Sequence, residues 1–390
     1  MKYFSKVRIT DGKMDETILA RDTEAVHFNI VKFASVLEYG AKGDGTTDDT
    51  TAITNAVNSG LPVYFPIGRY LVSSPITPAT AGQMFLGAGW GSVIIFSGES
   101  AFNCNNLPKI YITNLEIEEN AAHREAGYAI ANMTGQYCGV HRVRISAYNG
   151  IEHGANSGIV SDCEIRCVNN GIKIYNGDNT ETVENCIIAS YDFTGTPDNG
   201  VGVLVQSGAC ANLKNVSTLL KAAGVKFTGD FSSFNAIQCW FDNCNDSIVF
   251  DTGSTARRTR INNCWLNSRH DNVLIKGTAD GIWFDNCEFY KAADRAIRLE
   301  SGSTVNNFNV TNCLVCAGSS REGIDLYWGT ATNILINNNN FTAYDGSEAF
   351  YIAVSLNTDI SGIVCGNCMR GAQVPVNNAG SNMTVANNAV

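Results

Sequence analysis

Positive charge is scarce in this 390-residue sequence, because 27 Lys and Arg stand against 37 Asp and Glu and leave a net charge of −10. The one basic cluster, residues 257–260, holds three arginines. A protein that binds nucleic acid needs a basic patch or stripe on its surface. We therefore expect no nucleic-acid partner.

Long apolar segments are also lacking. No apolar run approaches the length that crosses a bilayer. Residues 1–10 (MKYFSKVRIT) carry basic residues without the apolar segment of a secretory signal. We expect no membrane insertion and synthesis in a cytoplasm. Proline is rare, with 7 residues, whereas 37 glycines and several Asn clusters favour strands separated by tight turns.

No disulfides are expected from the 14 cysteines, since nothing in the sequence indicates an oxidising compartment. Half of them follow Asn or Asp in one recurring pattern: Cys163, Cys186, Cys244, Cys264, Cys287, Cys313 and Cys368. A small, weakly polar side chain stacks well in a narrow interior, and the preceding Asn or Asp can form a turn or a side-chain ladder. We expect reduced cysteines, buried at one corner of a repeated coil.

A metal site is the alternative for four of these thiols. Cys313 with Cys316, and Cys365 with Cys368, have the spacing of zinc ligands. No histidine lies near either pair, and spacing without its structural context is a weak signal. We expect no metal and no cofactor.

A short strand start of the form Gly-Φ-x-Φ, in which Φ is apolar, recurs from residue 150 toward the C-terminus. It begins at Gly150, Gly171, Gly202, Gly224, Ser247, Asn272, Ala296, Gly323 and Ala349. Successive starts are 21 to 31 residues apart. A repeat of this period, made of short strands, indicates a solenoid whose turns bury their apolar faces by stacking.

Residues 36–60 (VLEYGAKGDGTTDDTTAITNAVNSG) hold the most specific motif of the chain. Gly40, Gly43 and Gly45, followed by Asp48 and Asp49, resemble the N-terminal motif of the pectate-lyase-like superfamily. Residues 62–76 and 85–96 are similar to its first strand pair and following coil. The resemblance implies an all-β fold, a right-handed parallel β-helix with a short N-terminal capping helix.

An apolar stripe at helical spacing follows the motif: Ala52, Ile53, Ala56 and Val57. It predicts a helix near residues 49–58 that closes the open end of the solenoid. Thr47 or Asp48 can cap this helix. The aspartates of the motif, Asp44 included, are thus interpreted as structural rather than catalytic.

The overall plan resembles that of phage tailspike proteins. This resemblance implies two parts, residues 1–32 as a virion-attachment segment that docks on a phage tail or baseplate protein, and residues 33–390 as the β-helix domain. It implies a location in the virion after synthesis in the host cytoplasm. It also implies a homotrimer, which would cover outward apolar residues such as Leu204, Val249 and Leu274.

Candidate catalytic residues come from the geometry of stacked strands. In each strand start the x residue points outward, and successive coils are about 4.8 Å apart. Glu300 and Asp325 then differ by one coil and two residues, which separates their Cα atoms by about 8 Å. Such a spacing suits the two carboxyl groups of an inverting glycosidase. Asp251, in the column of Glu300, is the reserve carboxylate.

The same face carries candidate substrate-binding residues. Lys276 and Arg298 would bind an acidic or hydroxyl-rich sugar, and Tyr327 with Trp328 would form a stacking platform. Two other acidic sites compete with this one. They comprise Glu116, Glu118 and Glu119 beside His123 and Arg124, and an insertion with Tyr191, Asp192, Phe193 and Asp198. Glu152 and His153 form a further pair without an assignable partner.

Three functions agree with these features. The first is a bacteriophage tailspike that binds and hydrolyses a host surface polysaccharide, either capsule or lipopolysaccharide. The others are a non-catalytic receptor-binding adhesin on the same fold and a cellular polysaccharide-degrading enzyme. Pectate lyases proper bind calcium through aspartates on successive coils, and that constellation is not evident here. We therefore expect hydrolysis rather than elimination, and the tailspike rather than its alternatives.

Overall fold

The computed structural model describes residues 9–10, 13–14, 32–120, 127–154, 156–175, 180–192, 195–292, 294–317, 322–343, 352–369, 372–378 and 382–389. The chain divides into two units, Met1–Lys32 and Phe33–Val390. In the first unit, β1 (Ile9–Thr10) and β2 (Lys13–Met14) form an antiparallel pair. Most of residues 1–32, for which virion attachment is predicted, lie outside the described residues.

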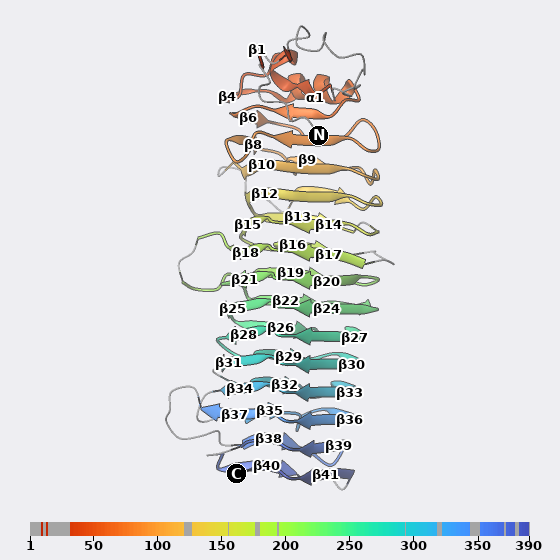
Figure 1. Ribbon diagram of the computed structural model, residues 1–390, viewed down its shortest axis with the longest axis vertical. Helices are drawn as coiled ribbons and strands as arrows, with labels where there is room; N and C mark the ends of the chain where they lie inside the picture. Colours follow the sequence, from red (N-terminus) through yellow and green to blue (C-terminus); the bar gives the residue numbers. More distant parts are fainter. Residues whose placement is uncertain are drawn as a thin grey trace, which may run out of the picture. The chain divides into compact units, whose positions relative to one another are not determined.

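The second unit confirms the predicted right-handed parallel β-helix, with strands stacked coil upon coil (Figure 1). Each regular coil contributes one strand to each of three faces. Sheet 1 is a 12-stranded parallel sheet. Its strands are β9 (Phe102–Asn103), β11 (Tyr128–Met133), β13 (Asn149–His153), β16 (Ile172–Ile174), β19 (Val201–Val205), β22 (Ala223–Phe227), β26 (Asp246–Phe250), β29 (Val273–Ile275), β32 (Ile297–Leu299), β35 (Glu322–Asp325), β38 (Ile352–Leu356) and β40 (Val374–Asn378).

The other two faces meet at a corner and are continuous through the long strands β10 (Tyr111–Glu119) and β12 (Gly139–Ala147). Sheet 2 contains β14 (Ile159–Ser161), β17 (Thr180–Glu184), β20 (Cys210–Lys214), β23 (Asp230–Phe231), β24 (Ser233–Ile237), β27 (Thr255–Asn262), β30 (Thr278–Asp285), β33 (Thr304–Thr311), β36 (Thr330–Asn337), β39 (Ile360–Cys365) and β41 (Asn382–Ala386). Sheet 3 contains β15 (Glu164–Cys167), β18 (Ile187–Ser190), β21 (Ser217–Leu219), β25 (Trp240–Cys244), β28 (Trp265–Ser268), β31 (Glu288–Ala292), β34 (Leu314–Ala317) and β37 (Asn340–Ala343). The first coils are built from β3 (Ala34–Ser35), β4 (Asp44–Asp48), β5 (Val63–Phe65), β6 (Gly68–Val72), β7 (Met84–Gly87) and β8 (Ser92–Phe96).

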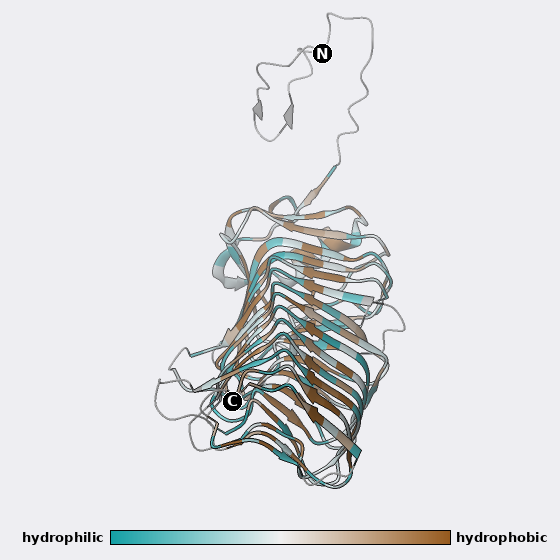
Figure 2. Ribbon diagram, turned by 60° about the horizontal axis from the view of Figure 1, so that its bottom comes forward, coloured by the Kyte–Doolittle hydropathy of each residue, from teal (hydrophilic) through white to brown (hydrophobic). Residues whose placement is uncertain are grey.

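The core is a set of apolar columns inside the coils. The first Φ position of each strand start stacks on the same position of the next coil, as in Ile172, Val203 and Val225, which are fully buried. Apolar stretches consequently recur at matching places in successive coils (Figure 2). The last strand start differs from the prediction. Asp325 pairs with Ser355, so the repeat resumes at Ala353 and not at Ala349.

The predicted capping helix is confirmed as α1 (Thr50–Asn58), which buries Ile53, Ala56 and Val57 after the short 3-10 helix η2 (Val36–Tyr39). The N-cap position is Asp49, and the predicted Asp48 contributes by accepting the backbone N–H of Thr50 on its Oδ1 at 3.0 Å. The Asp49 carboxylate accepts hydrogen bonds from the backbone N–H groups of Lys42 and Gly43 at 2.6 and 3.0 Å. The motif aspartate thus fixes the glycine-rich turn that leads into the helix. No helix among the described residues has the length and apolarity needed to cross a membrane.

The corner between sheets 2 and 3 explains the recurring Asn-Cys pattern. One residue per coil adopts a positive φ there, for example Asn185 at 54°, Asn263 at 53° and Asn286 at 53°. Asparagine tolerates this left-handed conformation better than most residues. The following side chain turns inward, which buries Cys186, Cys264 and their equivalents. Asn339 continues the column, since its Oδ1 accepts the backbone N–H of Cys313 at 2.9 Å.

Two of the seven patterned cysteines lie elsewhere. Cys244 ends β25 and contacts Thr218, so it belongs to the corner after sheet 3. Cys368 follows Asn367, and Asn367 takes the interior place because Asn339 donates its backbone N–H to Asn367 Oδ1 at 2.9 Å. The local sequences around Cys244 and Cys368 match the pattern, but these two cysteines lie at other positions of the coil.

All 14 cysteines are free, and eleven are buried. Burial raises the pKa of Cys244 to about 12 and that of Cys167 to about 11. We expect 14 reactive thiols in denatured protein without reductant, and slow reaction of most of them in the folded protein. Titration with a chromogenic disulfide reagent, with and without prior reduction, measures both. A clear increase in thiol count after reduction would show disulfides and contradict the expectation.

Candidate functional site

The register along sheet 1 confirms the predicted outward column. Glu152 pairs with Lys173, Lys173 with Leu204, and Leu204 with Lys226. The column continues through Val249, Leu274, Arg298 and Asp325. Arg298 and Asp325 are therefore direct neighbours on adjacent strands.

A second column runs beside it, just beyond the strand ends. The N–H groups of Asp251, Lys276 and Glu300 each donate to a carbonyl of the preceding coil, at 3.0, 2.8 and 2.9 Å. Asp251 also forms an ion pair with Lys226 at 2.7 Å. Burial raises the pKa of Asp251, but the hydrogen bonds from Lys226 and the Thr252 backbone and the charges of Lys226 and Lys276 together hold the pKa below its ordinary value. Asp251 thus remains ionised, which does not suit a general acid.

Two arginines and four carboxylates meet on β32 and β35 and on the segments beside β29 and β32, and we call this group the charged cluster. It comprises Asp271, Arg295, Arg298, Glu300, Glu322 and Asp325. Arg295 Nε lies 2.7 Å from Asp325 and 3.1 Å from Glu322. The Arg298 guanidinium lies 3.6 Å from Asp271 and 3.9 Å from Glu300. Each predicted catalytic carboxylate therefore contacts a different arginine.

The two predicted catalytic carboxylates differ in exposure. The side chain of Glu300 is 35% exposed, whereas Asp325 is only 1% exposed, although the column position had predicted an exposed group. Asp325 is covered because Arg295 packs against it and because its Oδ1 accepts the backbone N–H of Tyr327 at 3.1 Å. Burial raises the pKa of Asp325 above its ordinary value despite the nearby Arg295.

The predicted binding residues flank the charged cluster. Tyr327 and Trp328 are 43% and 55% exposed, and their rings meet edge to face with centroids 5.5 Å apart. Lys276 and Arg298 are partly exposed. The structure thus brings an exposed aromatic pair and Arg298 onto the coils that carry Glu300 and Asp325, with Lys276 on the preceding coil.

Sequence reasoning missed Asp271, Arg295 and Glu322, because it counted only residues within the Gly-Φ-x-Φ start. These residues lie three positions before the x residue, and so does Asp246. They form a column of their own, in which an aspartate carboxylate accepts the backbone N–H of the equivalent residue on the next coil. The N–H of Asp271 donates to Asp246 Oδ1 at 3.1 Å, and that of Arg295 donates to Asp271 Oδ1 at 3.0 Å. Four consecutive coils with a charged residue at this place were a signal present in the sequence.

Asp271 gives the charged cluster a measurable pH dependence. Burial raises its pKa to about 6, so between about pH 4 and 6 the folded state binds more protons than the unfolded state. The free energy of unfolding therefore falls as pH rises through this window. Asp271→Asn removes this titration. We expect the free energy of unfolding of Asp271→Asn minus that of wild type to rise by on the order of 2 kcal/mol from pH 4 to 7.

Chemical denaturation of both proteins across this pH range measures the difference. Asp230→Asn, which changes an exposed aspartate, is the control. A constant difference between wild type and Asp271→Asn would contradict the assignment of the raised pKa.

The competing sites are mostly engaged in ion pairs. Glu118 pairs with Arg69 at 2.5 Å, and Glu116 with Arg144 at 3.7 Å. Asp198 contacts the fully buried Lys221 at 2.7 Å. His123, Arg124 and Phe193 lie outside the described residues.

The pair Glu152 and His153 separates in the structure. Glu152 contacts Lys173 at 2.9 Å, whereas buried His153 contacts Glu181 at 2.7 Å. In the part of the chain that the structure describes, no three His, Cys, Asp or Glu side chains are arranged to hold a metal ion.

The predicted exposure of outward apolar residues, which a homotrimer would cover, holds for half-buried Leu204 but not for Val249 and Leu274. Val249 and Leu274 are each only 6% exposed and pack with Ala223 and Val201 on the outer side of sheet 1. Neighbouring residues of the same chain therefore already shield these side chains. The trimer stays a prediction from the resemblance alone.

Comparison with known proteins gives a family match. Residues 33–266 match the family model described as rhamnogalacturonase A/epimerase, pectate lyase-like. The pre-neck appendage protein of Bacillus phage phi29 is 28% identical over 213 residues, which cover 49% of this chain and 23% of that protein. The matched part thus spans about a quarter of that relative's length.

Solved structures share the fold. Tailspike protein 3 of bacteriophage CBA120 has a TM-score of 0.67 at 14% identity, covering 91% of this chain and 61% of that one. The A-module of the mannuronan C-5 epimerase AlgE6 of Azotobacter vinelandii has a TM-score of 0.59 at 15% identity, covering 91% and 99%. At such identities the likeness concerns the fold alone.

Proposed function

Because the chain belongs to the rhamnogalacturonase A/epimerase, pectate lyase-like family, we propose that it is a phage tail appendage that binds and hydrolyses a bacterial surface polysaccharide. Its similarity to an appendage protein of phage phi29 and to a tailspike of phage CBA120 supports the phage part of this proposal. Residues 1–32 would attach it to a tail or baseplate protein, and three copies would assemble. These last two points rest on the resemblance.

The observation that carries hydrolysis is the charged cluster beside an exposed Tyr–Trp pair. A polysaccharide can lie along sheet 1 because its coils present a regular surface with side chains repeated about every 4.8 Å. Tyr327 and Trp328 would stack on a sugar ring, and Lys276 with Arg298 would bind its hydroxyl or carboxyl groups. The scissile bond would then lie next to Glu300 and Asp325.

The chemistry needs one acid and one base. Asp325, with its raised pKa, would donate a proton to the glycosidic oxygen as the bond from that oxygen to the sugar carbon breaks. Because Arg295 covers Asp325, this step requires Arg295 to move aside when the sugar binds. Glu300, which is partly exposed, would take a proton from the water that attacks this carbon. The register separates the two Cα atoms by about 8 Å, and inverting glycosidases hold their carboxyl groups about 6.5–9.5 Å apart.

The test is incubation of the full chain with purified capsule and lipopolysaccharide, followed by sizing of the products. Hydrolysis should shorten the chains and release one reducing end per cut, without the unsaturated sugar that elimination leaves. Binding without shortening would favour the adhesin function. Neither binding nor shortening of any surface polysaccharide would contradict the proposal.

A further inference from the structure

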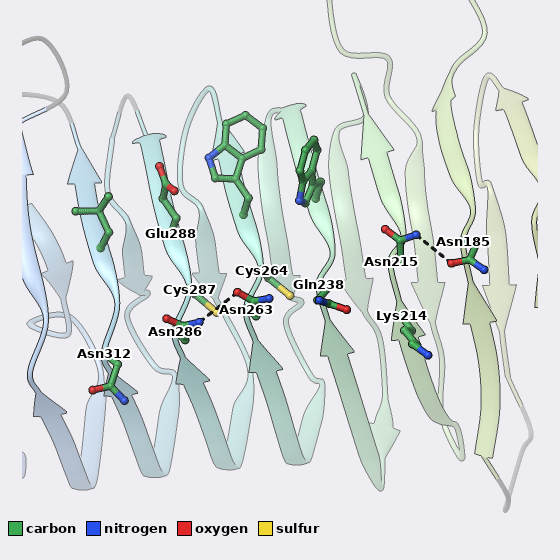
Figure 3. A pocket seen from close by; sticks show the side chains of 13 residues that line it. Asn185, Lys214, Asn215, Gln238, Asn263, Cys264, Asn286, Cys287, Glu288 and Asn312 are labelled. Atoms are coloured by element: carbon green, nitrogen blue, oxygen red, sulfur yellow. Dashed lines mark hydrogen bonds between the residues drawn. The ribbon is translucent and has the colours of Figure 1, made fainter.

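A groove runs along the corner between sheets 2 and 3, on a different face from the charged cluster. Its volume is about 1000 Å³. Its floor carries one exposed amide side chain per coil, and these side chains lie in a row across neighbouring coils (Figure 3). They are Asn185, Asn215, Gln238, Asn263, Asn286 and Asn312. We call it the amide groove, and at about 4.8 Å per coil it is about 24 Å long.

Hydrogen bonds between the floor amides use only part of their donor and acceptor groups. Asn215 donates to Asn185 at 3.0 Å and Asn286 to Asn263 at 3.2 Å. An amide has two N–H donors and two acceptor lone pairs, so each ladder bond leaves capacity free. Gln238 interrupts the ladder, and its side chain makes no hydrogen bond within the described residues. The floor can therefore exchange hydrogen bonds with a ligand rich in hydroxyl groups.

Two tryptophans on successive coils line one wall of the amide groove. Trp240 and Trp265 are paired neighbours on β25 and β28 with ring centroids 5.9 Å apart. The Trp265 ring also contacts Tyr290, which lies outside the groove lining, with centroids 5.7 Å apart. Trp240 is 60% exposed. Exposed aromatic rings offer large apolar contact area beside polar groups, which matches the mixed apolar and hydroxylated faces of a sugar ring.

Charge decides which sugars fit. The lining includes only two charged side chains, Lys214 and Glu288, of opposite sign. The protein as a whole has a net charge of −10, so an anionic polysaccharide would find no electrostatic attraction in this groove. A second protein copy is disfavoured, because a dry interface would bury the free amide groups at a cost. A wet, hydroxyl-rich ligand keeps them hydrogen-bonded.

From this combination we propose that the amide groove is a second carbohydrate-binding site, which holds a neutral glycan chain along the axis of the β-helix. The site binds without cleaving, and it stands whether or not the charged cluster is catalytic. Its occupant extends over several coils, since the amides of the floor repeat from coil to coil and two successive coils each add a tryptophan.

The experiment measures binding of the full chain to laminarihexaose, cellohexaose, maltohexaose and mannohexaose by calorimetry, with hexagalacturonate as an anionic comparison. We expect at least one neutral hexasaccharide to bind. Trp240→Ala and Trp265→Ala should each weaken binding about five- to tenfold, the scale for loss of one aromatic contact. Trp90→Ala removes a tryptophan that is 48% exposed elsewhere and should change affinity less than about twofold.

Other outcomes would overturn the inference. No binding of any neutral hexasaccharide, or tighter binding of hexagalacturonate, would contradict a neutral glycan. Loss of binding in Trp328→Ala but not in Trp240→Ala would place the sugar on sheet 1. A change of oligomeric state in Trp240→Ala, seen by sedimentation with glycan affinity unchanged, would identify the groove as a contact between copies.

Discussion

Replacing Glu300 with Gln, or Asp325 with Asn, is expected to lower the rate of polysaccharide cleavage at least about a hundredfold, while binding survives. Positioned acid–base groups contribute on this scale. Gln and Asn keep the size and one acceptor oxygen of each side chain, so Asp325→Asn can still accept the backbone N–H of Tyr327. Reducing-end release measures the rate, and co-sedimentation with the polysaccharide measures binding.

Matched controls separate chemistry from general damage. Glu38→Gln and Asp230→Asn make the same chemical changes at exposed places on the chain, and both should cleave at the wild-type rate. Asp325 is buried against Arg295, so the unfolding midpoint of Asp325→Asn must be measured alongside its activity. Near-normal cleavage by both Glu300→Gln and Asp325→Asn would remove this pair from the mechanism.

Asp271→Asn also tests which carboxyl group acts as the general acid. Asp271 contacts the same guanidinium as Glu300 and has a pKa of about 6, so it is the other carboxyl near Glu300 that burial biases toward the protonated form. If Asp325→Asn cleaves normally and Asp271→Asn does not, the acid is Asp271 and Glu300 keeps its role.

The second large effect concerns the glycine that begins each early strand start. A Cβ at Gly171 would lie 2.2 Å from Ile188 Cγ2 and 2.6 Å from the carbonyl oxygen of Gly202. Gly202 and Gly224 are equally confined by the next coil. Because backbone of the following coil blocks the space, the clash cannot be relieved by a side-chain rotation. We expect Gly171→Ala to lower the free energy of unfolding by about 3 kcal/mol.

Gly91→Ala is the matched control. Its added Cβ would meet Ile67 at 3.4 Å, an ordinary contact, and stability should change by less than about 0.5 kcal/mol. Denaturant titrations of both variants give the comparison. Equal stability of Gly171→Ala and Gly91→Ala would mean that the coils can move apart at this corner.

The sequence by itself determined the solenoid, because its signals are local. A tolerated left-handed turn at Asn263 is a constraint that one residue imposes on its own backbone, and the glycine that begins the early strand starts recurs in the sequence itself. The apolar stripe of α1 is equally local. Such signals recur with the coil, so the repeat and the capping helix could be predicted without coordinates.

Only the tertiary structure decided what stands next to what across the coils. Asp271, Arg298 and Glu300 come together because β29 and β32, whose first residues are Val273 and Ile297, stack in one register. The burial of Asp325 and the row of Trp240 and Trp265 depend on the same kind of stacking. A one-residue shift would move each of these side chains to another face, so their neighbours and exposure follow from the register of the complete stack.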